Sequence, residues 1–363
     1  MNILDWRWWL GLRPKFKNSY HNYSIAVVVP AYNEEENIKA TLDSLMGQTV
    51  IKKCKSYRII VVDDFSSDRT NEFARSKGAE VIRPAFNQGT KAAAQNYALP
   101  MINDDLIVTV DADTKLDPKA IENTLYFFND PKTASVCGMV IPQKIETIWE
   151  KGRFIEYLFG ITVFKGAQNN VGAVLVSSGC FSVFRTKLLK TIGGFDAKTM
   201  AEDMYATWKF QLLGYHIYFA PDAYCYPLDP PNMKIYLNQL DRWYRSFFQN
   251  IKAHSLKRNK KLAIFIYSYL IDGIFSPIMI ALLLIFLAGK LPLSLLILLV
   301  LSELIVIFLV CLPMGIKLKM FSKVLVSIPC YYFVRPFNVY IFLRSFWKEW
   351  IIKEPLAVWH KGH

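Results

Sequence analysis

The sequence predicts an α/β domain, followed by amphipathic helices at a membrane surface and a small helical membrane region. In the N-terminal part, short β-branched runs alternate with helix-like stretches, which is the pattern of βαβ units. Hydrophobic residues make up 53% of the 363 residues, and they concentrate after Leu262. A chain of this length has room for one large core and an appendage.

We expect five regions, whose boundaries follow changes in composition. They are an aromatic and basic membrane-interface segment (1–23), the α/β domain (24–230), amphipathic interface helices (231–261), transmembrane or re-entrant helices (262–345) and a basic tail (346–363). The first segment has no apolar stretch of the length that a signal peptide needs. The six cysteines form no CxxC pair and are expected to be reduced thiols.

The strands and helices of the α/β domain are predicted from their hydrophobic pattern. The expected strands are 25–29, 58–62, 80–83 and 106–110, and the expected helices between them are 35–46 and 68–77. This alternation favours a mostly parallel sheet. Because the carboxyl ends of strands form the ligand crevice in open α/β sheets, the polar residues after each run should converge.

A pair of carboxylates follows the fourth expected strand. Asp111 and Asp113 flank a small alanine, and the two-residue period of an extended chain places both side chains on the same side. Such a pair suits Mg²⁺ or Mn²⁺, with phosphate oxygens and water as the remaining ligands. The alternative is an acidic turn without a ligand.

Two further strand ends carry polar residues that could contact a nucleotide. Asp63 and Asp64 follow the second strand and precede the stretch 66–68, which would cap the next helix. A purely structural role is expected for one of the two aspartates, while the other can bind a base edge. Gly89 and Lys91 lie at a loop-to-helix junction, where free N–H groups and an ammonium favour an anion. A merely solvated lysine is the alternative.

Glu202 and Asp203 begin a helix expected over 204–213, which should stop at Gly214. Acidic residues at a helix start commonly complement the helix dipole. The functional alternative is a general base for a hydroxyl nucleophile. The dipole should then lower the pKa of the base, so positioning would matter more than basicity.

Gln239, Arg242 and Trp243 share one face of a predicted helix. A guanidinium can reach a diphosphate and an indole can stack on a sugar ring. The aromatic and basic residues around them are also typical of a helix that lies on a membrane, so a purely structural role is the alternative.

The C-terminal part carries three apolar segments. Segments 262–287 and 291–312 are each long enough to cross a hydrocarbon core of about 30 Å, and a turn at Gly289 would join them into a hairpin. Segment 324–343 contains Pro329, Arg335 and Pro336, which favours a re-entrant or interface-lying segment, or a tight broken pair. Asp272 and Glu303 within the hairpin could line a polar path or pair between helices.

Charge indicates the side of the membrane and the partners. The basic residues that follow the hairpin and the third segment should lie in the cytosol with the α/β domain; they are Lys317, Lys319, Lys323, Arg344, Lys348, Lys353 and Lys361. The net charge is +13, and the basic residues cluster beside apolar segments. Anionic lipid is therefore the expected partner, rather than nucleic acid.

Five motifs occur in a fixed order: PAYNE at 30–34, VVDD at 61–64, DAD at 111–113, ED at 202–203 and QLDRW at 239–243. In order and spacing they make the chain similar to membrane-bound family 2 glycosyltransferases. That group includes cellulose, chitin, hyaluronan and poly-N-acetylglucosamine synthases, and also ceramide glucosyltransferase. The resemblance covers roughly residues 24–250 by motif, and the rest of the chain by layout.

The resemblance implies a GT-A fold, a UDP-sugar donor and a role for each motif residue. Tyr32, Glu34 and Asp64 (or Asp63) would surround the uridine, Asp113 helped by Asp111 would bind the metal, and Lys91, Gln239 and Arg242 would lie near the diphosphate. Ser178, Gly179 and Cys180 would flank the acceptor, Trp243 would be its platform, and Asp203, beside Glu202, would be the base. Thr90 departs from the family pattern, because it interrupts the usual Gly-Lys step.

The resemblance also implies an inverting transfer by a single displacement. The first hypothesis is a processive synthase that extends a polysaccharide and passes it outward, with a homo-oligomer supplying further channel walls. The second is transfer of a single sugar to a lipid acceptor, which suits the small membrane part. A membrane scaffold or transporter with an inactive domain is disfavoured by Asp113, Asp203 and Arg242. The tail around Trp359 resembles a degenerate gating segment.

Overall fold

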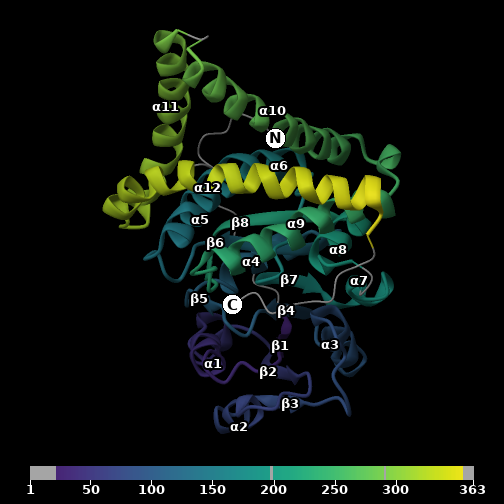
Figure 1. Cartoon of the computed structure of the whole chain (residues 1–363). Coiled ribbons are helices and arrows are strands. Elements are labelled where there is room, and N and C mark those ends of the chain that lie inside the picture. The colour runs from purple at the N-terminus through teal and green to yellow at the C-terminus, as the bar shows by residue number, and fades with distance from the viewer. Residues whose placement is uncertain (1–21, 197–198, 290–291, 355–363) are drawn as a thin grey trace.

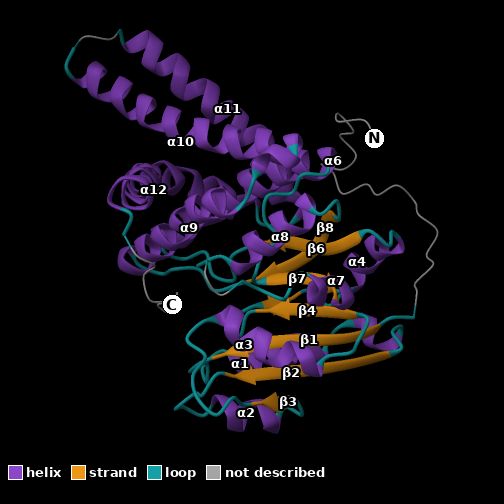
Figure 2. Ribbon diagram, turned by 90° about the vertical axis from the view of Figure 1, so that its right-hand side faces the viewer, coloured by secondary structure: helices purple, strands orange, loops and turns teal. Residues whose placement is uncertain are grey.

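The computed structural model describes residues 22–196, 199–289 and 292–354, and it has the expected α/β architecture (Figures 1 and 2). A sheet forms the body of the molecule, and a layer of long helices covers one end of it. The expected interface segment 1–23, apart from its last two residues, and the tail around Trp359 and Lys361 lie outside the described residues.

The described strands form one sheet in the order β3-β2-β1-β4-β7-β6-β8-β5. Their bounds are Ser24–Ala31 (β1), Ser56–Asp63 (β2), Glu80–Ile82 (β3), Leu106–Val110 (β4), Lys115–Leu116 (β5), Thr133–Val140 (β6), Phe181–Arg185 (β7) and His216–Tyr226 (β8). The first four strands are parallel to one another, as predicted. The other half is mixed, because β7 runs antiparallel to both β4 and β6 while β6 and β8 are parallel.

Short helices connect the strands. They are Ile38–Met46 (α1), Thr70–Ser76 (α2), Lys91–Ala98 (α3), Glu122–Leu125 (α4), Ile148–Phe159 (α5), Gly166–Val171 (α6), Thr186–Thr191 (α7) and Glu202–Leu212 (α8). A turn of π-helix over Gly160–Lys165 joins α5 to α6. Helix α8 is the one predicted over 204–213, and the chain leaves it at Gly214 with a positive φ of 85°.

Both faces of the sheet are covered, which explains why its central strands are continuous apolar runs. Along β1, Ile25, Val27 and Val29 face the cluster that contains α1, whereas Ala26 and Val28 face the cluster that contains α3 and α5. The sheet therefore lies between two apolar layers, and its polar groups gather in the loops at the carboxyl edge.

Four long helices follow the α/β body: Met233–Ala253 (α9), Lys260–Leu287 (α10), Leu293–Lys317 (α11) and Phe321–Trp347 (α12). Helices α10 and α11 project away from the sheet (Figure 2). Helix α12 lies across α5 and α9 (Figure 1) and ends in a second π-helical turn over Lys348–Ile352. At Gly152 of α5, an added Cβ would come within 2.7 Å of Val334 on α12, so the two helices are in direct contact.

Helix α12 corrects one expectation for the third apolar segment. The alternative that this segment forms two short helices broken at its prolines is wrong, because a single helix continues through Pro329 and Pro336 without interruption. Among the described residues, one helix, Phe321–Ile352, is long and apolar enough to cross a bilayer, and a third of its apolar stretch is buried inside the protein. Its re-entrant or interfacial placement stays a prediction.

The two acidic residues of the expected hairpin have different surroundings. Glu303 of α11 forms an ion pair with Arg335 of α12, which agrees with the helix-pairing alternative for that residue. Asp272 of α10 is exposed. Whether the hairpin crosses a membrane stays a prediction.

Candidate functional site

The structure brings together the charged residues from three separate parts of the sheet edge. Lys91 at the first position of α3 forms an ion pair with Asp111, which follows β4. The Lys91 Nζ atom also lies 3.4 Å from an oxygen of Glu202 at the start of α8. Residues more than 100 positions apart thus form one cluster, in which Asp111 comes from a strand end and Lys91 and Glu202 come from the first turns of two helices.

Lys91 is the electrostatic centre of this cluster. Its ammonium donates a hydrogen bond to the Gly179 carbonyl at 3.0 Å. Although burial by itself lowers the pKa of Lys91, the carboxylates of Asp111 and Glu202 raise that pKa above its usual value. Thr90, which departs from the family pattern, has a structural role here. Its hydroxyl caps α3 by accepting from the Ala93 N–H at 3.1 Å. The cap places Lys91 on the first turn.

Asp203 is held by two backbone donors. One carboxylate oxygen accepts from the Gly179 N–H at 2.7 Å, and the other accepts from the Met204 N–H at 2.7 Å. Burial, followed by the negative charge of Glu202, raises the pKa of Asp203 to about 6. The expectation that the helix dipole would lower this pKa is therefore wrong, because desolvation and a like charge outweigh the dipole.

The acceptor-motif residues Ser178, Gly179 and Cys180 lie in the loop before β7, beside Asp203. An added Cβ at Gly179 would come within 3.0 Å of both Asp203 Oδ2 and Lys91 Nζ, so a larger residue there would require these two groups to shift by a few tenths of an ångström. Lys165, at the end of the π-helical turn, donates to the Ser178 hydroxyl at 2.8 Å. The sequence gives no local signal for Lys165, because a π-helical turn has no recognisable pattern.

Asp63 and Asp64 have different environments. Asp63 is completely buried; it pairs with Arg83 at 2.5 Å and accepts from the Asn71 side chain at 2.8 Å and the Ser66 N–H at 3.0 Å. Asp64 accepts from the Gln88 N–H at 2.7 Å, and burial raises its pKa. Asp63 therefore maintains the loop structure, which leaves Asp64 as the better candidate for contact with a base.

The other two nucleotide-site residues follow β1. Tyr32 is 41% exposed and Glu34 is buried. The Glu34 N–H donates to the Thr70 hydroxyl at 2.7 Å, which ties this loop to the start of α2. The ring of Tyr32 is accessible at the same sheet edge as Asp64, whose N–H donates to the Ala31 carbonyl at 2.8 Å.

The carboxylates that could hold a metal are few. In the parts of the chain that the structure describes, no group of three or more His, Cys, Asp or Glu side chains is arranged to hold an ion. Asp111 is paired with Lys91, and Asp113, the principal metal-binding candidate from the sequence, lies two residues further along the chain. This donor set fits a hard divalent ion only if substrate phosphates and water supply most of its ligands.

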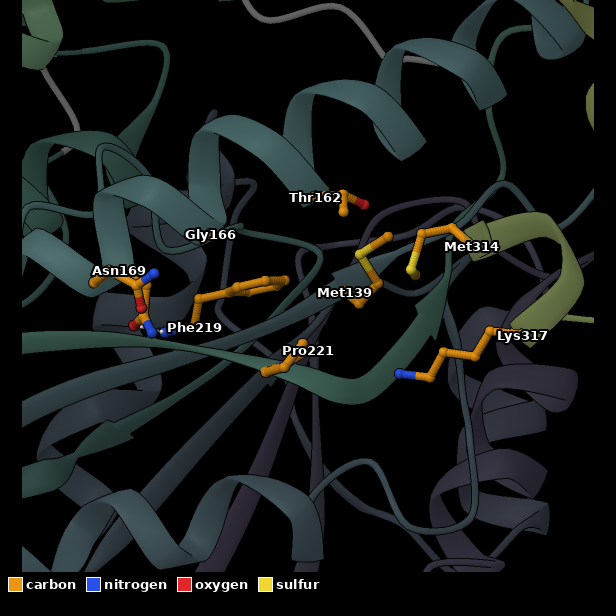
Figure 3. Close-up of a pocket in the computed structure, with 9 residues that line it drawn as sticks. Met139, Thr162, Gly166, Asn169, Phe219, Pro221, Met314 and Lys317 are labelled. Carbon is orange, nitrogen blue, oxygen red and sulfur yellow. Dashed lines mark hydrogen bonds between the residues drawn. The ribbon is translucent and has the colours of Figure 1, made fainter. Parts of the chain in front are cut away.

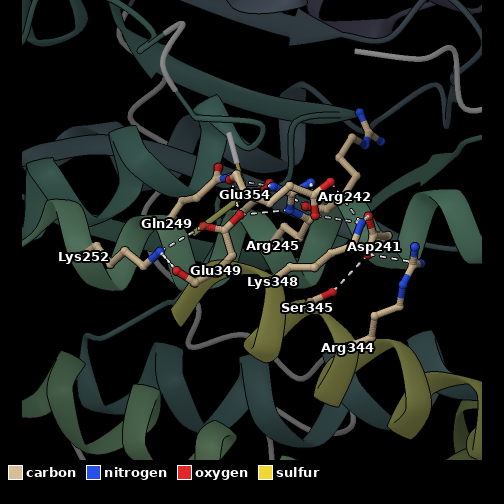
Figure 4. A network of polar contacts seen from close by, with 11 residues as sticks. Asp241, Arg242, Arg245, Gln249, Lys252, Arg344, Ser345, Lys348, Glu349 and Glu354 are labelled. Atoms are coloured by element: carbon tan, nitrogen blue, oxygen red, sulfur yellow. Dashed lines mark hydrogen bonds and ion pairs between the residues drawn. The ribbon is translucent and has the colours of Figure 1, made fainter. Parts of the chain in front are cut away.

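The QLDRW motif lies on α9, where two of its side chains contact α5. The side-chain amide oxygen of Gln239, Oε1, accepts from an Arg153 guanidinium N–H at 3.0 Å, and the centre of the Trp243 ring lies 4.6 Å from the same guanidinium. For Arg242, no ion pair with a described residue is found. Figure 4 shows its side chain pointing away from the neighbouring ionic network.

That network joins α9 to the end of α12. Arg245 is buried and lies 2.9 Å from Glu349, which also pairs with Lys252 at 3.0 Å (Figure 4). Asp241 faces Arg344 at 3.7 Å and Lys348 at 3.9 Å. Arg344 and Lys348, two of the basic residues expected in the cytosol, therefore also contact α9, the helix that carries the QLDRW motif.

A small, mostly apolar pocket lies apart from this cluster. Figure 3 shows Met139, Phe219 and Met314 around it, and Lys317 at its edge pairs with Asp222 at 3.0 Å. None of the residues expected at the active site lines it. The charged cluster at the strand ends thus remains the candidate active site.

The mixed sheet and the carboxylates at its edge define a GT-A glycosyltransferase fold. Residues 21–246 match the family described as "Glycosyltransferase like family 2". Because this match spans more than half of the chain, the protein belongs to that family.

Proteins similar to the chain include two curated relatives and one solved structure. Poly-beta-1,6-N-acetyl-D-glucosamine synthase of Staphylococcus epidermidis is 30% identical over 261 residues, covering 68% of this chain and 60% of the relative. The same enzyme of Staphylococcus aureus (strain COL) is 31% identical over 245 residues, covering 63% and 58%. The chain thus spans about three fifths of the length of these relatives.

Mannosyltransferase PcManGT from Pyrobaculum calidifontis, solved in complex with GDP-Man and Mn2+, has a TM-score of 0.67 at 21% identity. The match covers 96% of this chain and 94% of that one. At this identity the likeness concerns the fold, including the layer of helices after the sheet.

Proposed function

We propose that the protein is a membrane-bound inverting glycosyltransferase that moves N-acetylglucosamine from UDP-N-acetylglucosamine to the growing end of a polysaccharide. The observation that carries this proposal is the cluster in which Asp203, fixed by two backbone N–H groups, lies beside Lys91 and Asp111. The names of the similar synthases support the sugar and the polymer.

In this proposal Asp203 is the general base. A hydroxyl of the acceptor attacks the anomeric carbon of the donor, its proton passes to the Asp203 carboxylate, and the bond to UDP breaks as the new bond forms. The two N–H groups that bind Asp203 fix its orientation, which favours proton transfer along one direction. Trp243 supplies the stacking platform for the acceptor sugar, and the loop around Gly179 flanks it.

Positive groups would bind the leaving diphosphate. The Lys91 ammonium is kept protonated by its carboxylate neighbours, and Arg242 is free of ion pairs with described residues. Mg²⁺ or Mn²⁺ held by Asp113, with help from Asp111, would offset charge on the diphosphate. Asp64, Tyr32 and Glu34 would contact the uridine.

The outer face of α12 supports attachment to a bilayer. Its inner residues pack on α5 and α9, whereas a stripe at helical spacing is apolar and exposed: Phe333, Tyr340, Leu343 and Trp347. Aromatic residues with nearby lysines are typical of a helix at the headgroup boundary. We place the α/β body on the cytosolic side, where UDP-sugars are available, and anionic lipid around the helices.

The direct test of the function is product analysis. Purified full-length protein in nanodiscs, incubated with a panel of radiolabelled UDP-sugars, should form a long polymer from UDP-N-acetylglucosamine alone. A lipid-soluble product carrying one sugar would instead select the single-addition hypothesis. Absence of any transfer from every donor would contradict both.

The raised pKa of Asp203 predicts the pH dependence of transfer. The base accepts a proton only when it is ionised, so activity should be present above pH 6 and fall as the pH drops through about 6. Because the charge of Glu202 contributes to the raised pKa, E202Q should move this acid limb to lower pH. The measurement is the rate at saturating donor across pH 5–8. A limb that does not move in E202Q would contradict the electrostatic coupling.

Substitution G179A should reduce transfer by about 10-fold or more, because the added Cβ displaces the Asp203 carboxylate and the Lys91 ammonium from their positions. The matched control is G166A, where no atom lies within 4 Å of the added Cβ. Initial rates of the two variants with UDP-N-acetylglucosamine make the comparison. Equal rates would show that the close packing around Gly179 has no catalytic consequence.

A further inference from the structure

Arg153 on α5 is a buried cation that none of the sequence motifs includes. Its side chain is 4% exposed, and its guanidinium lies 2.7 Å from Glu156 on the next turn. A buried guanidinium is costly unless several groups compensate it, so its partners indicate what it holds in place.

Its first set of partners lies on α9. The guanidinium donates to Gln239 at 3.0 Å, and its carbon lies 4.5 Å from the centre of the Tyr236 ring and 4.6 Å from the centre of the Trp243 ring. Contact with two aromatic rings combined with a directed hydrogen bond suits the planar, multi-donor guanidinium of arginine better than the ammonium of lysine. Arg153 therefore fixes the face of α9 that carries the expected acceptor platform.

Its second partner lies beyond the end of β8. Asp229 is buried, accepts from the Tyr157 hydroxyl at 3.0 Å, and lies 3.8 Å from Arg153 Nε. Within the described part of the chain, neither Arg153 Nε nor Asp229 Oδ2 has a hydrogen-bond partner. A small movement of the guanidinium and the carboxylate toward each other would therefore allow a direct hydrogen bond between Arg153 and Asp229.

The segment that carries Asp229 also reaches the metal-binding candidate. Strand β8 pairs with β5, and Tyr226 of β8 lies opposite Lys115 of β5. Lys115 follows Asp113 by two residues in the sequence. The Gln143 amide lies 3.3 Å from the Tyr226 carbonyl and 3.5 Å from the Asp113 carbonyl, which joins the two strand ends. Burial raises the pKa of Asp229 to about 7, and the charge of nearby Asp113 adds to that rise.

We propose that Arg153 is a positioning residue, which holds the acceptor platform Trp243 in register with the strand end that carries Asp113. The inference rests on the proposed function. Arg153 does not touch the donor; it acts through Trp243 and Gln239 on one side and through Asp229 on the other. Its loss should impair the transfer step and leave nucleotide binding intact.

The test compares full-length wild-type protein with R153M and R153K in nanodiscs. Transfer from UDP-N-acetylglucosamine is measured together with donor hydrolysis, UDP affinity and the melting temperature. We expect R153M to retain UDP affinity and hydrolysis but to lose about 10²-fold in transfer, with shorter products. R153K keeps the charge but not the planar guanidinium, and should recover only part of the loss. Lys151, two residues earlier on the same helix, is half-buried and its side chain forms no hydrogen bond or ion pair with a described residue, so K151M is the matched control.

A double-mutant cycle separates positioning from general stability. If Arg153 acts through Trp243, then R153M should add little to the loss already caused by W243F. Fully additive effects would overturn the proposal, as would a parallel loss of UDP binding and transfer, or failure of both R153M and R153K to fold. If the wild type itself transfers no sugar, the proposed function fails; if the wild type transfers and R153M does so equally well, only the positioning role fails.

Discussion

D203N is expected to abolish sugar transfer while UDP still binds. Removal of a general base typically costs about 10²- to 10⁴-fold in rate, and nucleotide binding depends on residues at other strand ends. Both oxygens of Asp203 accept from backbone N–H groups, so the amide of D203N must turn its own NH₂ toward one of those donors. D203A avoids that repulsion and should be equally inactive.

The measurements are initial transfer rates and UDP titrations on the same preparations. E72Q is the matched control, because Glu72 lies on the surface of α2 and pairs only with its neighbour Arg69 among the described residues. Transfer by D203N or D203A at the wild-type rate would remove Asp203 from the role of base. Loss of UDP binding in both variants would instead indicate a structural role.

Excess chelator is expected to eliminate transfer, and Mg²⁺ or Mn²⁺ should restore it. The physical reason is the small donor set that we propose, in which Asp113 with help from Asp111 holds the ion. An ion held by so few carboxylates relies on the diphosphate for its remaining ligands and should exchange readily. The measurement is the transfer rate as a function of free metal concentration.

The same titration of transfer rate against metal concentration tests whether Asp113 binds the ion. D113N should require a much higher metal concentration for half-maximal rate, whereas D43N, a surface carboxylate on α1 that pairs with Lys77, should behave as the wild type. Full activity in chelator would show that transfer is independent of a metal. An unchanged metal dependence in D113N would show that Asp113 is not a ligand of the ion.

The sequence was most informative where local pattern and topology agree. Strands β1 and β4 were predictable because each is an apolar run that is buried along most of its length and followed by polar residues, and the apolar second half of β2 shares this pattern. Topology then brings Lys91, Asp111 and Glu202 together without any detailed knowledge of side chains. The roles assigned to these residues remain predictions.

Features that depend on long-range packing were not predictable. The antiparallel insertion of β7 joins segments with no turn signal between them. Arg153 and Gln239 are 86 residues apart, and neither lies in a pattern that indicates the other. The pKa of Asp203 also depends on burial, which a helix-dipole argument does not include. The continuity of α12 through two prolines depends on its packing against α5 and α9.

One apolar cluster crosses the boundary between the α/β body and the helices that follow it. Phe154, Ile155 and Leu158 of α5 share it with Ile307, Cys311 and Met314 of α11 and with Val324 and Ile328 of α12. A chain shortened after α9 would expose that face of α5 to water, at a cost of about 25 cal/mol for each Å² of apolar surface. Truncation to a water-soluble enzyme should therefore yield aggregates, and heating should melt both halves in a single cooperative transition.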